Sequence, residues 1–366
     1  MQRSNEALLK LRRELHRSPS LPGAEKETAR IVARFFSWLR PDRTIEGLGG
    51  AGLAFVFDGE AAGPTVMLRC ELDAVPAGAG AAHLCGHDGH MTIMAGVGLA
   101  LSRNRPARGR ALLLYQPAEE TGEGAGKVIE DPRFARIAPD HVFALHNLPG
   151  FPAGSIVIRE GTFAMASRGM AVRLSGRTAH AAEPEKGISP ARAMCGLVES
   201  LEKLPGRICS GDPAAMVTVV GACLGGRSFG TAPGDGEVFA TLRCSSDEGM
   251  ERLSGGAEDL ARRESEAGGL AHSVEYEDVF MATVNSPGAV DIVMKASGEA
   301  QVIDPGGPFP WSEDFGRLTA ICDGAMFGLG AGEDAPPLHS PGYEFPDALI
   351  EPGVSIFRGI LEEILA

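Results

Sequence analysis

The chain has 366 residues, of which 44% are hydrophobic and 22% are charged, a composition typical of a globular protein. A single hydrophobic core stops growing well before this length, so the length predicts two domains. The formal net charge of -14 leaves no broad basic face, and we therefore expect no nucleic acid as a partner.

The amino-terminal segment and the cysteines indicate a cytoplasmic protein. Residues 1–18 are charged and amphipathic, without the apolar core of a signal peptide, and no apolar run reaches the length of a membrane span. We expect no membrane partner. The seven cysteines are an odd number in a chain too large to need disulfides, so most are expected to be reduced and buried.

Apolar residues recur at helical spacing in residues 5–17 and 24–40. Shorter apolar runs follow, each ended by turn residues, and an apolar stretch within residues 88–103 is long enough for a buried helix. The short runs are residues 52–57, 65–70, 111–116, 141–146 and 155–158. This alternation predicts an α/β domain with a mostly parallel sheet and helices on both faces. Such sheets bind ligands beyond the carboxyl ends of their strands, so functional residues are expected just after the runs.

The pattern changes near residue 166. Residues 168–276 read strand, helix, strand, strand, helix, strand, which is the order of the ferredoxin-like α+β fold. After residue 285 the alternation of the first part resumes. We therefore expect an inserted ferredoxin-like domain at 166–283 and a discontinuous catalytic domain formed by 1–165 and 284–366.

The segment HLCGHDGH, residues 83–90, places three histidines, a cysteine and an aspartate at the start of the predicted buried helix. A zinc finger is excluded because no second Cys or His pair follows at the required spacing, and a redox site is excluded because no resolving cysteine is near. Cys85 and His87 remain as a thiolate and imidazole pair suited to zinc, cobalt or manganese-like ions. Asp88 is expected to cap the helix.

Further candidate ligands follow the later runs. Glu119 and Glu120 come after the third run, and adjacent carboxylates repel each other unless a cation lies between them. If one of them binds a metal, its neighbour can act as a base toward a metal-bound water. His146 ends the fourth run, and His339 lies in a Pro- and Gly-containing loop after the predicted strand AMFGLG.

Seven segments resemble the M20 family of metal-dependent amidohydrolases, in the branch of bacterial aminoacylases, hippurate hydrolases and auxin-conjugate hydrolases. They follow the family's order over nearly the whole chain, and CGHDGH together with QPAEE is highly specific. The segments are CELDAVP (70–76), HLCGHDGH (83–90), YQPAEETGEGA (115–125), FALHN (143–147), GRTAHAAEP (176–184), WSEDFG (311–316) and PLHSP (337–341).

The resemblance implies an enzyme that hydrolyses the amide bond of small N-acyl amino acids or related conjugates. It implies two divalent metal ions, which could be zinc, manganese, nickel or cobalt, and Glu119 as the general base. The ligands that it implies are Cys85, His87, Glu120, His146 and His339.

The resemblance also gives the inserted domain a role as a lid that carries dimer contacts. His180 matches a lid histidine that stabilises the developing oxyanion, commonly in the active site of the partner subunit, so a homodimer or higher homo-oligomer is implied. Asp73 and Asp88 are expected to support ligands without binding metal. His83 and His90 are expected to support ligands or to cap the helix.

The sequence departs from the family in the lid, where Phe229-Gly230-Thr231-Ala232-Pro233 stands for Phe-Asn-Val-Ile-Pro, so that Gly230 replaces an asparagine that helps to hold substrate. It also reads Glu71-Leu72-Asp73 where relatives read Asp-Met-Asp, which keeps both charges. Two alternatives stay open: a dipeptidase or carboxypeptidase with the same metal centre, and a metal-binding protein that has lost catalysis. Ser312, Glu313 and Asp314 are expected to cap a helix, although the family places this segment beside the metals. His16 is expected to be an ordinary surface or strand-edge residue.

Overall fold

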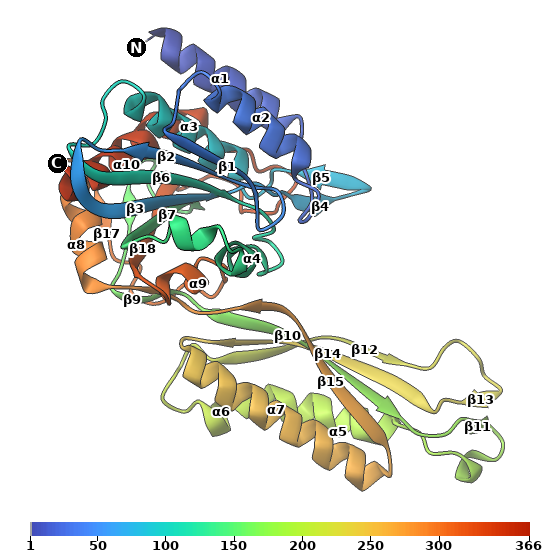
Figure 1. Ribbon diagram of the computed structural model, residues 1–366. Coiled ribbons are helices and arrows are strands. Elements are labelled where there is room, and N and C mark those ends of the chain that lie inside the picture. Colours follow the sequence, from blue (N-terminus) through green and yellow to red (C-terminus); the bar gives the residue numbers. More distant parts are fainter. Residues whose placement is uncertain (1) are drawn as a thin grey trace. The chain divides into compact units, whose positions relative to one another are not determined.

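The computed structural model describes residues 2–366, and the side chains from residue 4 onward. The described chain divides into two compact units, drawn in Figure 1. Unit 1 contains residues up to 163, 283–307 and 313–366, and unit 2 contains residues 164–282 and 308–312. Residues 308–312 group with unit 2 because the Met165 N–H donates to the carbonyl oxygens of Phe309 and Trp311, each at 3.1 Å.

Unit 1 is built on an eight-stranded sheet. In spatial order its strands are β1 (Arg43–Leu48), β2 (Gly52–Asp58), β6 (Arg108–Gln116), β3 (Ala61–Glu71), β7 (His141–Pro149), β18 (Asp323–Gly332), β8 (Ile156–Val157) and β17 (Val302–Ile303). The four central strands β6, β3, β7 and β18 run parallel, and Leu68 on β3 pairs with Leu113 on β6 and with Phe143 on β7. Their carboxyl ends therefore lie at one edge of the sheet.

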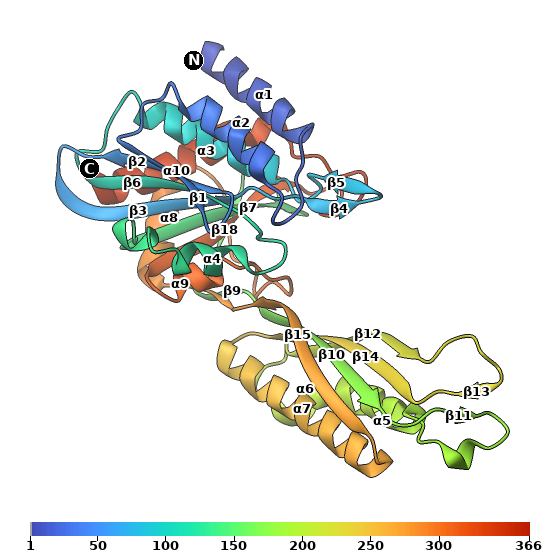
Figure 2. The same ribbon diagram turned by 45° about the vertical axis from the view of Figure 1, so that its right-hand side comes forward.

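Helices cover both faces of this sheet (Figures 1 and 2). One hydrophobic cluster joins the sheet to α1 (Gln2–His16), α2 (Lys26–Phe36), α3 (His87–Leu101), α8 (Pro287–Ala296) and α10 (Ile350–Leu365). On the opposite face α4 (Gly124–Glu130) packs against α9 (Gly316–Thr319). The central strands are apolar on both sides because both sides are covered. Shorter elements are β4 (Val75–Ala77), β5 (Gly80–Ala82), η1 (Phe134–Arg136), β9 (Gly161–Ala164), β16 (Thr283–Asn285) and η3 (Asp347–Leu349).

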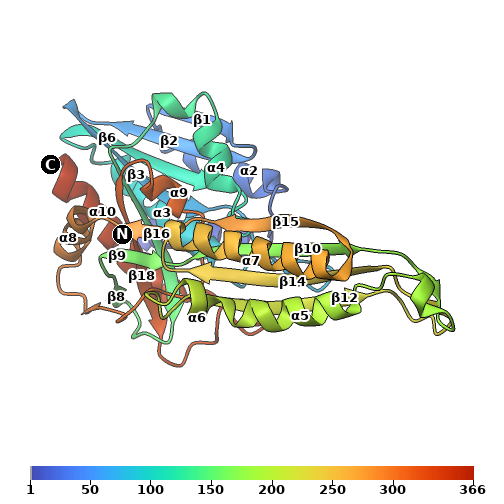
Figure 3. The same ribbon diagram turned by 90° about the horizontal axis from the view of Figure 1, so that it is seen from below.

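Unit 2 has a four-stranded antiparallel sheet with its own hydrophobic core. Its strands and long helices are β10 (Ala166–Ser175), α5 (Ala191–Glu202), β12 (Met216–Leu224), β14 (Asp235–Cys244), α7 (Asp247–Gly268) and β15 (Ala271–Phe280). The strand order is β12-β14-β10-β15, and α5 and α7 lie over one face, as Figure 3 shows. Shorter elements are β11 (Ala179–His180), η2 (Pro184–Lys186), α6 (Leu204–Ile208) and β13 (Thr231–Ala232). The predicted fold class, a mostly parallel α/β domain with an inserted ferredoxin-like domain, is confirmed.

Within the described residues, no helix is long and apolar enough to cross a membrane.

Candidate metal centre

The five predicted ligands and Glu119 come together in unit 1, beyond the carboxyl ends of the central parallel strands. Among the described residues, Glu71, His87 and His90 have donor atoms within 4.8 Å of one another, and so do three groups made up only of predicted ligands and Glu119. The groups are Cys85, His87 and His146; Cys85, Glu120 and His339; and His87, Glu119 and Glu120. Because Cys85 belongs to two groups and Glu120 to two, the groups form one continuous cluster.

A glycine turn delivers Cys85 and His87 to the cluster. Gly86 has φ 93°, a left-handed conformation that favours glycine, and His87 is the first residue of α3. A Cβ on Gly86 would lie 2.2 Å from Oδ1 of Asn147. The turn therefore needs glycine both for its backbone angle and for the close approach of β7.

Backbone contacts fix the orientation of two histidine rings. Nδ1 of His87 donates to the carbonyl oxygen of Asp73 at 3.0 Å, so Nε2 is the nitrogen that faces Oε1 of Glu120, 3.8 Å away. Nδ1 of His146 donates to the carbonyl oxygen of Asn147 at 2.9 Å, and Nε2 lies 3.4 Å from Sγ of Cys85. Each ring therefore presents an unprotonated Nε2 to the cluster, the form in which histidine binds metal.

His339 reaches the cluster from a loop more than two hundred residues away in the sequence. Its backbone N–H donates to the carbonyl oxygen of Leu84 at 2.8 Å, which attaches the loop beside Cys85. Its Nε2 lies 3.2 Å from Sγ of Cys85 and 3.7 Å from Oε1 of Glu120. His339 has φ 62°, a conformation that costs a non-glycine residue about 1–3 kcal/mol and is concentrated at functional sites.

The charges of the cluster fit divalent cations. Burial, followed by repulsion from Glu313 and Glu120, raises the pKa of Glu119 well above its ordinary value, and burial raises the pKa of Glu120 to about 7. Burial likewise lowers the pKa of His87 well below its ordinary value. Nε2 of His87, Oε1 of Glu120 and Oδ1 of Asp73 are buried without a hydrogen-bond partner. Cations bound to this thiol, imidazole and carboxylate set would satisfy the His87 and Glu120 atoms and offset the repulsion.

Asp73 contacts two of the candidate ligands. Besides its carbonyl contact with His87, its Oδ2 accepts a hydrogen bond from the backbone N–H of Glu120 at 2.9 Å. Asp73 thus contacts both the start of α3 and the segment that follows β6, and fixes their positions relative to each other.

Asp88 does not cap α3, and that prediction was wrong, because the helix begins one residue earlier, at His87. Its carboxylate instead accepts hydrogen bonds from Arg12 and from Nδ1 of His16, each at 2.7 Å. Burial alone would raise the pKa of Asp88, but the His16 hydrogen bond and the charge of Arg12 lower it to about 2. His16 is therefore not an ordinary surface residue.

Both ring nitrogens of His90 form hydrogen bonds with residues that are not predicted ligands. Nδ1 donates to Oε2 of Glu71 at 2.7 Å, and Nε2 accepts the backbone N–H of Asn147 at 3.2 Å. His83 is buried and occurs in none of the metal-binding groups found among the described residues.

A buried charge network beside the cluster was not predicted. Arg69, which is 0% exposed, donates to Glu71, to Oε1 of Gln116 at 2.9 Å, to Glu313 at 3.3 Å and to Asp314 at 2.6 Å. The capping role expected for Glu313 and Asp314 was wrong, because α9 begins only at Gly316 and both carboxylates are buried against Arg69. The available signal was an arginine inside the apolar run TVMLRC, where a charge requires a buried partner.

His180 belongs to unit 2, on the short strand β11, and its side chain is exposed. Its Nδ1 accepts a hydrogen bond from the backbone N–H of Ala182 at 3.0 Å, so Nε2 carries the proton. Gly230 lies in the neighbouring loop, and its carbonyl oxygen accepts the N–H of Ala181 at 3.0 Å.

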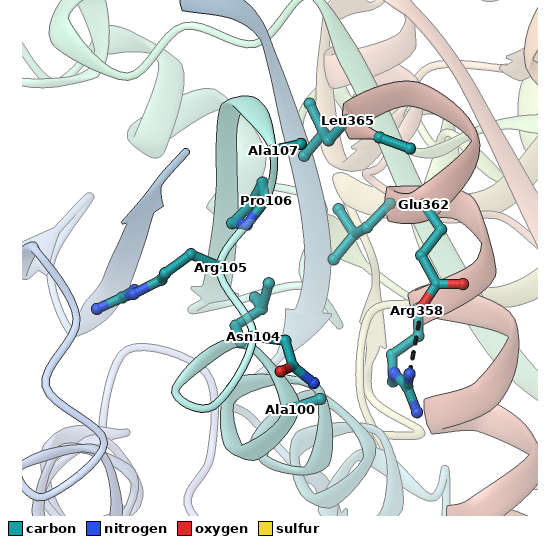
Figure 4. A pocket seen from close by; sticks show the side chains of 11 residues that line it. Ala100, Asn104, Arg105, Pro106, Ala107, Arg358, Glu362 and Leu365 are labelled. Atoms are coloured by element: carbon teal, nitrogen blue, oxygen red, sulfur yellow. Dashed lines mark hydrogen bonds and ion pairs between the residues drawn. The ribbon is translucent and has the colours of Figure 1, made fainter. Parts of the chain in front are cut away.

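A cavity of about 200 Å³ lies between the carboxyl ends of α3 and α10 (Figure 4). Its lining includes Leu101, Arg105, Arg358 and Leu365. The 15 residues of α3 span about 22 Å at 1.5 Å per residue, so this cavity is remote from His87. It is not part of the metal centre.

Comparison with known proteins identifies the family. The model of peptidase family M20/M25/M40 matches residues 67–363. The chain belongs to this family. The M20 resemblance inferred from the sequence motifs is therefore confirmed.

Curated relatives in the M20 family include deacetylases. The chain is 30% identical to an N-acetyl-L-cysteine deacetylase of Bacillus subtilis, over 94% of this chain and 84% of the relative. It is 27% identical to an N-acetyldiaminopimelate deacetylase of Oenococcus oeni, over 98% of each chain. A solved structure, the Bacillus subtilis YXEP protein, described as a dinuclear metal binding peptidase of the M20 family, superposes with a TM-score of 0.83 at 20% identity, covering 100% of this chain and 99% of that one. The predictions of an amide hydrolase and of a two-metal cofactor agree with these relatives.

Proposed function

We propose that this M20 chain hydrolyses the amide bond of small N-acyl amino acids or related conjugates. The observation that carries the proposal is the pair Glu119 and Glu120 at one edge of the Cys and His cluster, where one carboxylate can bind metal while the other remains a base. The names of two relatives, an N-acetyl-L-cysteine deacetylase and an N-acetyldiaminopimelate deacetylase, support N-acyl substrates over the dipeptide alternative.

Cys85, His87, Glu120, His146 and His339 would hold two divalent cations, which when bound polarise the amide carbonyl and lower the pKa of water toward neutrality. Glu119 takes a proton from the attacking water and passes it to the leaving nitrogen. The water oxygen bonds to the carbonyl carbon, the C–N bond breaks, and the products are a carboxylate and an amine.

The test is Glu119→Gln, with Glu123→Gln as the matched control, since Glu123 is an exposed neighbour paired with Lys127. General bases contribute about 10²–10⁴-fold, so we expect Glu119→Gln to lose at least about 100-fold in kcat while still binding two metal ions. Glu123→Gln should keep wild-type kcat. Wild-type turnover by Glu119→Gln protein would exclude the mechanism.

The acyl group that the enzyme accepts is determined by testing N-acetyl, N-benzoyl and dipeptide substrates. The protein is loaded separately with zinc, manganese, nickel or cobalt. Release of free amine from one acyl class, lost in Glu119→Gln, would identify the substrate. Preference for free dipeptides would overturn the N-acyl proposal. The metal that acts in the cell and the cytoplasmic location stay predictions.

We also propose that His180 stabilises the developing oxyanion in the site of a partner subunit. The support is an exposed imidazole whose Nε2–H is available as a donor. Mixing inactive Glu119→Gln protein with inactive His180→Ala protein tests this. Mixed dimers contain one site with both groups only if His180 acts across subunits, so recovered activity supports the proposal and lasting inactivity contradicts it.

A further inference from the structure

The segment that carries Glu119 and Glu120, residues 117–123, connects β6 to α4, and its two ends lie against each other. The N–H of Gly124 donates to the carbonyl oxygen of Ala118 at 3.0 Å, and a Cβ on Gly124 would lie 1.6 Å from the carbonyl oxygen of Pro117. Ala118 has φ 49°, a strained conformation for alanine. A strained segment keeps such a conformation only if contacts with neighbouring residues stabilise it.

One carboxylate contacts both ends of this segment. Oδ1 and Oδ2 of Asp314 accept hydrogen bonds from Nε2 of Gln116, at 2.8 and 2.7 Å, where β6 ends. Oδ2 also accepts the backbone N–H of Ala125 at 2.7 Å, in the first turn of α4. Asp314 is 0% exposed, so these hydrogen bonds form without competition from water.

Arg69 orients Asp314. Its Nη2 donates to Oδ1 of Asp314 at 2.6 Å, and its Nε donates to Oε1 of Gln116 at 2.9 Å. The Gln116 amide is thereby fixed with its NH₂ toward Asp314. Hydrogen bonds to a buried carboxylate of this kind are about twice as strong as neutral ones.

We propose that Asp314 is a positioning residue that joins the two ends of the 117–123 segment and so holds Glu119 and Glu120 in their reactive places. The proposal rests on the function proposed above. Asp314 touches neither ligand nor substrate; it acts through Gln116 and Ala125. A base displaced by about 1 Å can lose about 100-fold in rate, so this attachment has a measurable consequence.

The test is Asp314→Asn, which keeps the size of the side chain but replaces one acceptor oxygen by a donor NH₂. The matched control is Asp304→Asn, which makes the same change at an exposed carboxylate of unit 1 that accepts a hydrogen bond from the backbone N–H of Gly306. Three measurements are made on each protein: amide hydrogen exchange, metal affinity by chelator competition, and steady-state kinetics for kcat and KM.

In Asp314→Asn we expect amides at Gly122, Gly124 and Ala125 to exchange about tenfold faster or more, while Leu145 in β7 keeps its protection. Loss of support for a ligand costs about 10–100-fold, so the affinity for one metal ion should fall in that range. We expect kcat to fall about 10–100-fold, with KM changed less than about threefold. The control should match wild type in all three.

The proposal is overturned if the 117–123 segment keeps wild-type exchange rates, or if protection falls equally across unit 1, which would mean a general loss of stability. If Asp314→Asn does not fold, Gln116→Met is measured instead, which removes the attachment of Asp314 at the end of β6 and keeps its hydrogen bond from the Ala125 N–H. If wild-type protein cleaves none of the N-acyl substrates, the proposed function fails, while exchange and metal affinity still decide the role of Asp314.

Discussion

His87 and His90 lie one turn apart on α3, with ring centroids 5.6 Å apart, yet only His87 directs a nitrogen without a partner toward the carboxylates of the metal cluster. Both nitrogens of His90 are engaged, by Glu71 and by Asn147. These two histidines of one helix thus differ in chemistry because their ring nitrogens have different partners.

We therefore expect His87→Gln to lose one metal ion and His90→Gln to keep two. His90→Gln should still be destabilised, since removing a buried partner of Glu71 costs about 1–3 kcal/mol. Elemental analysis after dialysis gives the metal content, and denaturant unfolding gives the free energy. Two ions in His87→Gln would show that His87 is not a ligand.

Removal of metal should destabilise unit 1. Without cations, the buried carboxylates of Glu119, Glu120 and Asp73 must take up protons or repel one another. Burial raises the pKa of all three, and repulsion from neighbouring carboxylates adds to each shift. A ligand that binds only the folded state adds about 2.7 kcal/mol at 100 times its Kd. Thermal unfolding before and after chelation measures the effect, and an unchanged Tm would contradict it.

The His16–Asp88 pair should make stability depend on pH. The hydrogen bond to Asp88 raises the pKa of His16 above its ordinary value of 6.5, against the opposing effects of burial and of Arg12, with Glu344 also facing the ring. A raised pKa in the folded state means that the stabilisation is complete below the ordinary value and disappears as the pH rises through the folded value.

The measurement is the difference in free energy of unfolding between wild type and His16→Gln, in the presence of chelator so that metal binding does not contribute. At about pH 5.5 wild type should be the more stable protein, and at about pH 8.5 the difference should shrink. A difference that is constant with pH would show that His16 stays uncharged beside Asp88.

Gly86→Ala should disturb both stability and metal binding. The new Cβ would lie 2.2 Å from Oδ1 of Asn147. The alanine would also have to hold the left-handed backbone conformation of Gly86, which costs about 1–3 kcal/mol by itself. Gly150→Ala is the matched control, because Gly150 has φ 86° but no atom within 4 Å of its Cβ position. Chelator competition should show weaker binding for Gly86→Ala alone, and equal losses in the two variants would contradict the role of the close approach.

The central strands and α3 could be predicted because covered elements are apolar throughout. Strand β1 was missed because its residues, RTIEGL, are mostly exposed and lack an apolar run. Cys85, Glu119 and Glu120 could be predicted as site residues because each follows a recognisable apolar run or motif. The partners of Arg69 could not, because Asp314 lies 245 residues away and only the folded sheet brings the two together. The same holds for His16 and Asp88, whose pairing depends on how α1 packs on α3.

The division of the chain affects its biosynthesis. Cys85, His87, Glu120 and His146 all precede unit 2 in the sequence, whereas His339 and strand β18 follow it. A ribosome therefore delivers almost the whole inserted domain, which has its own core, before the segments that complete the central sheet. The proposed metal pocket can close only after β18 and His339 have been synthesised, so a nascent chain stalled before β18 would carry four of the candidate donors without the fifth.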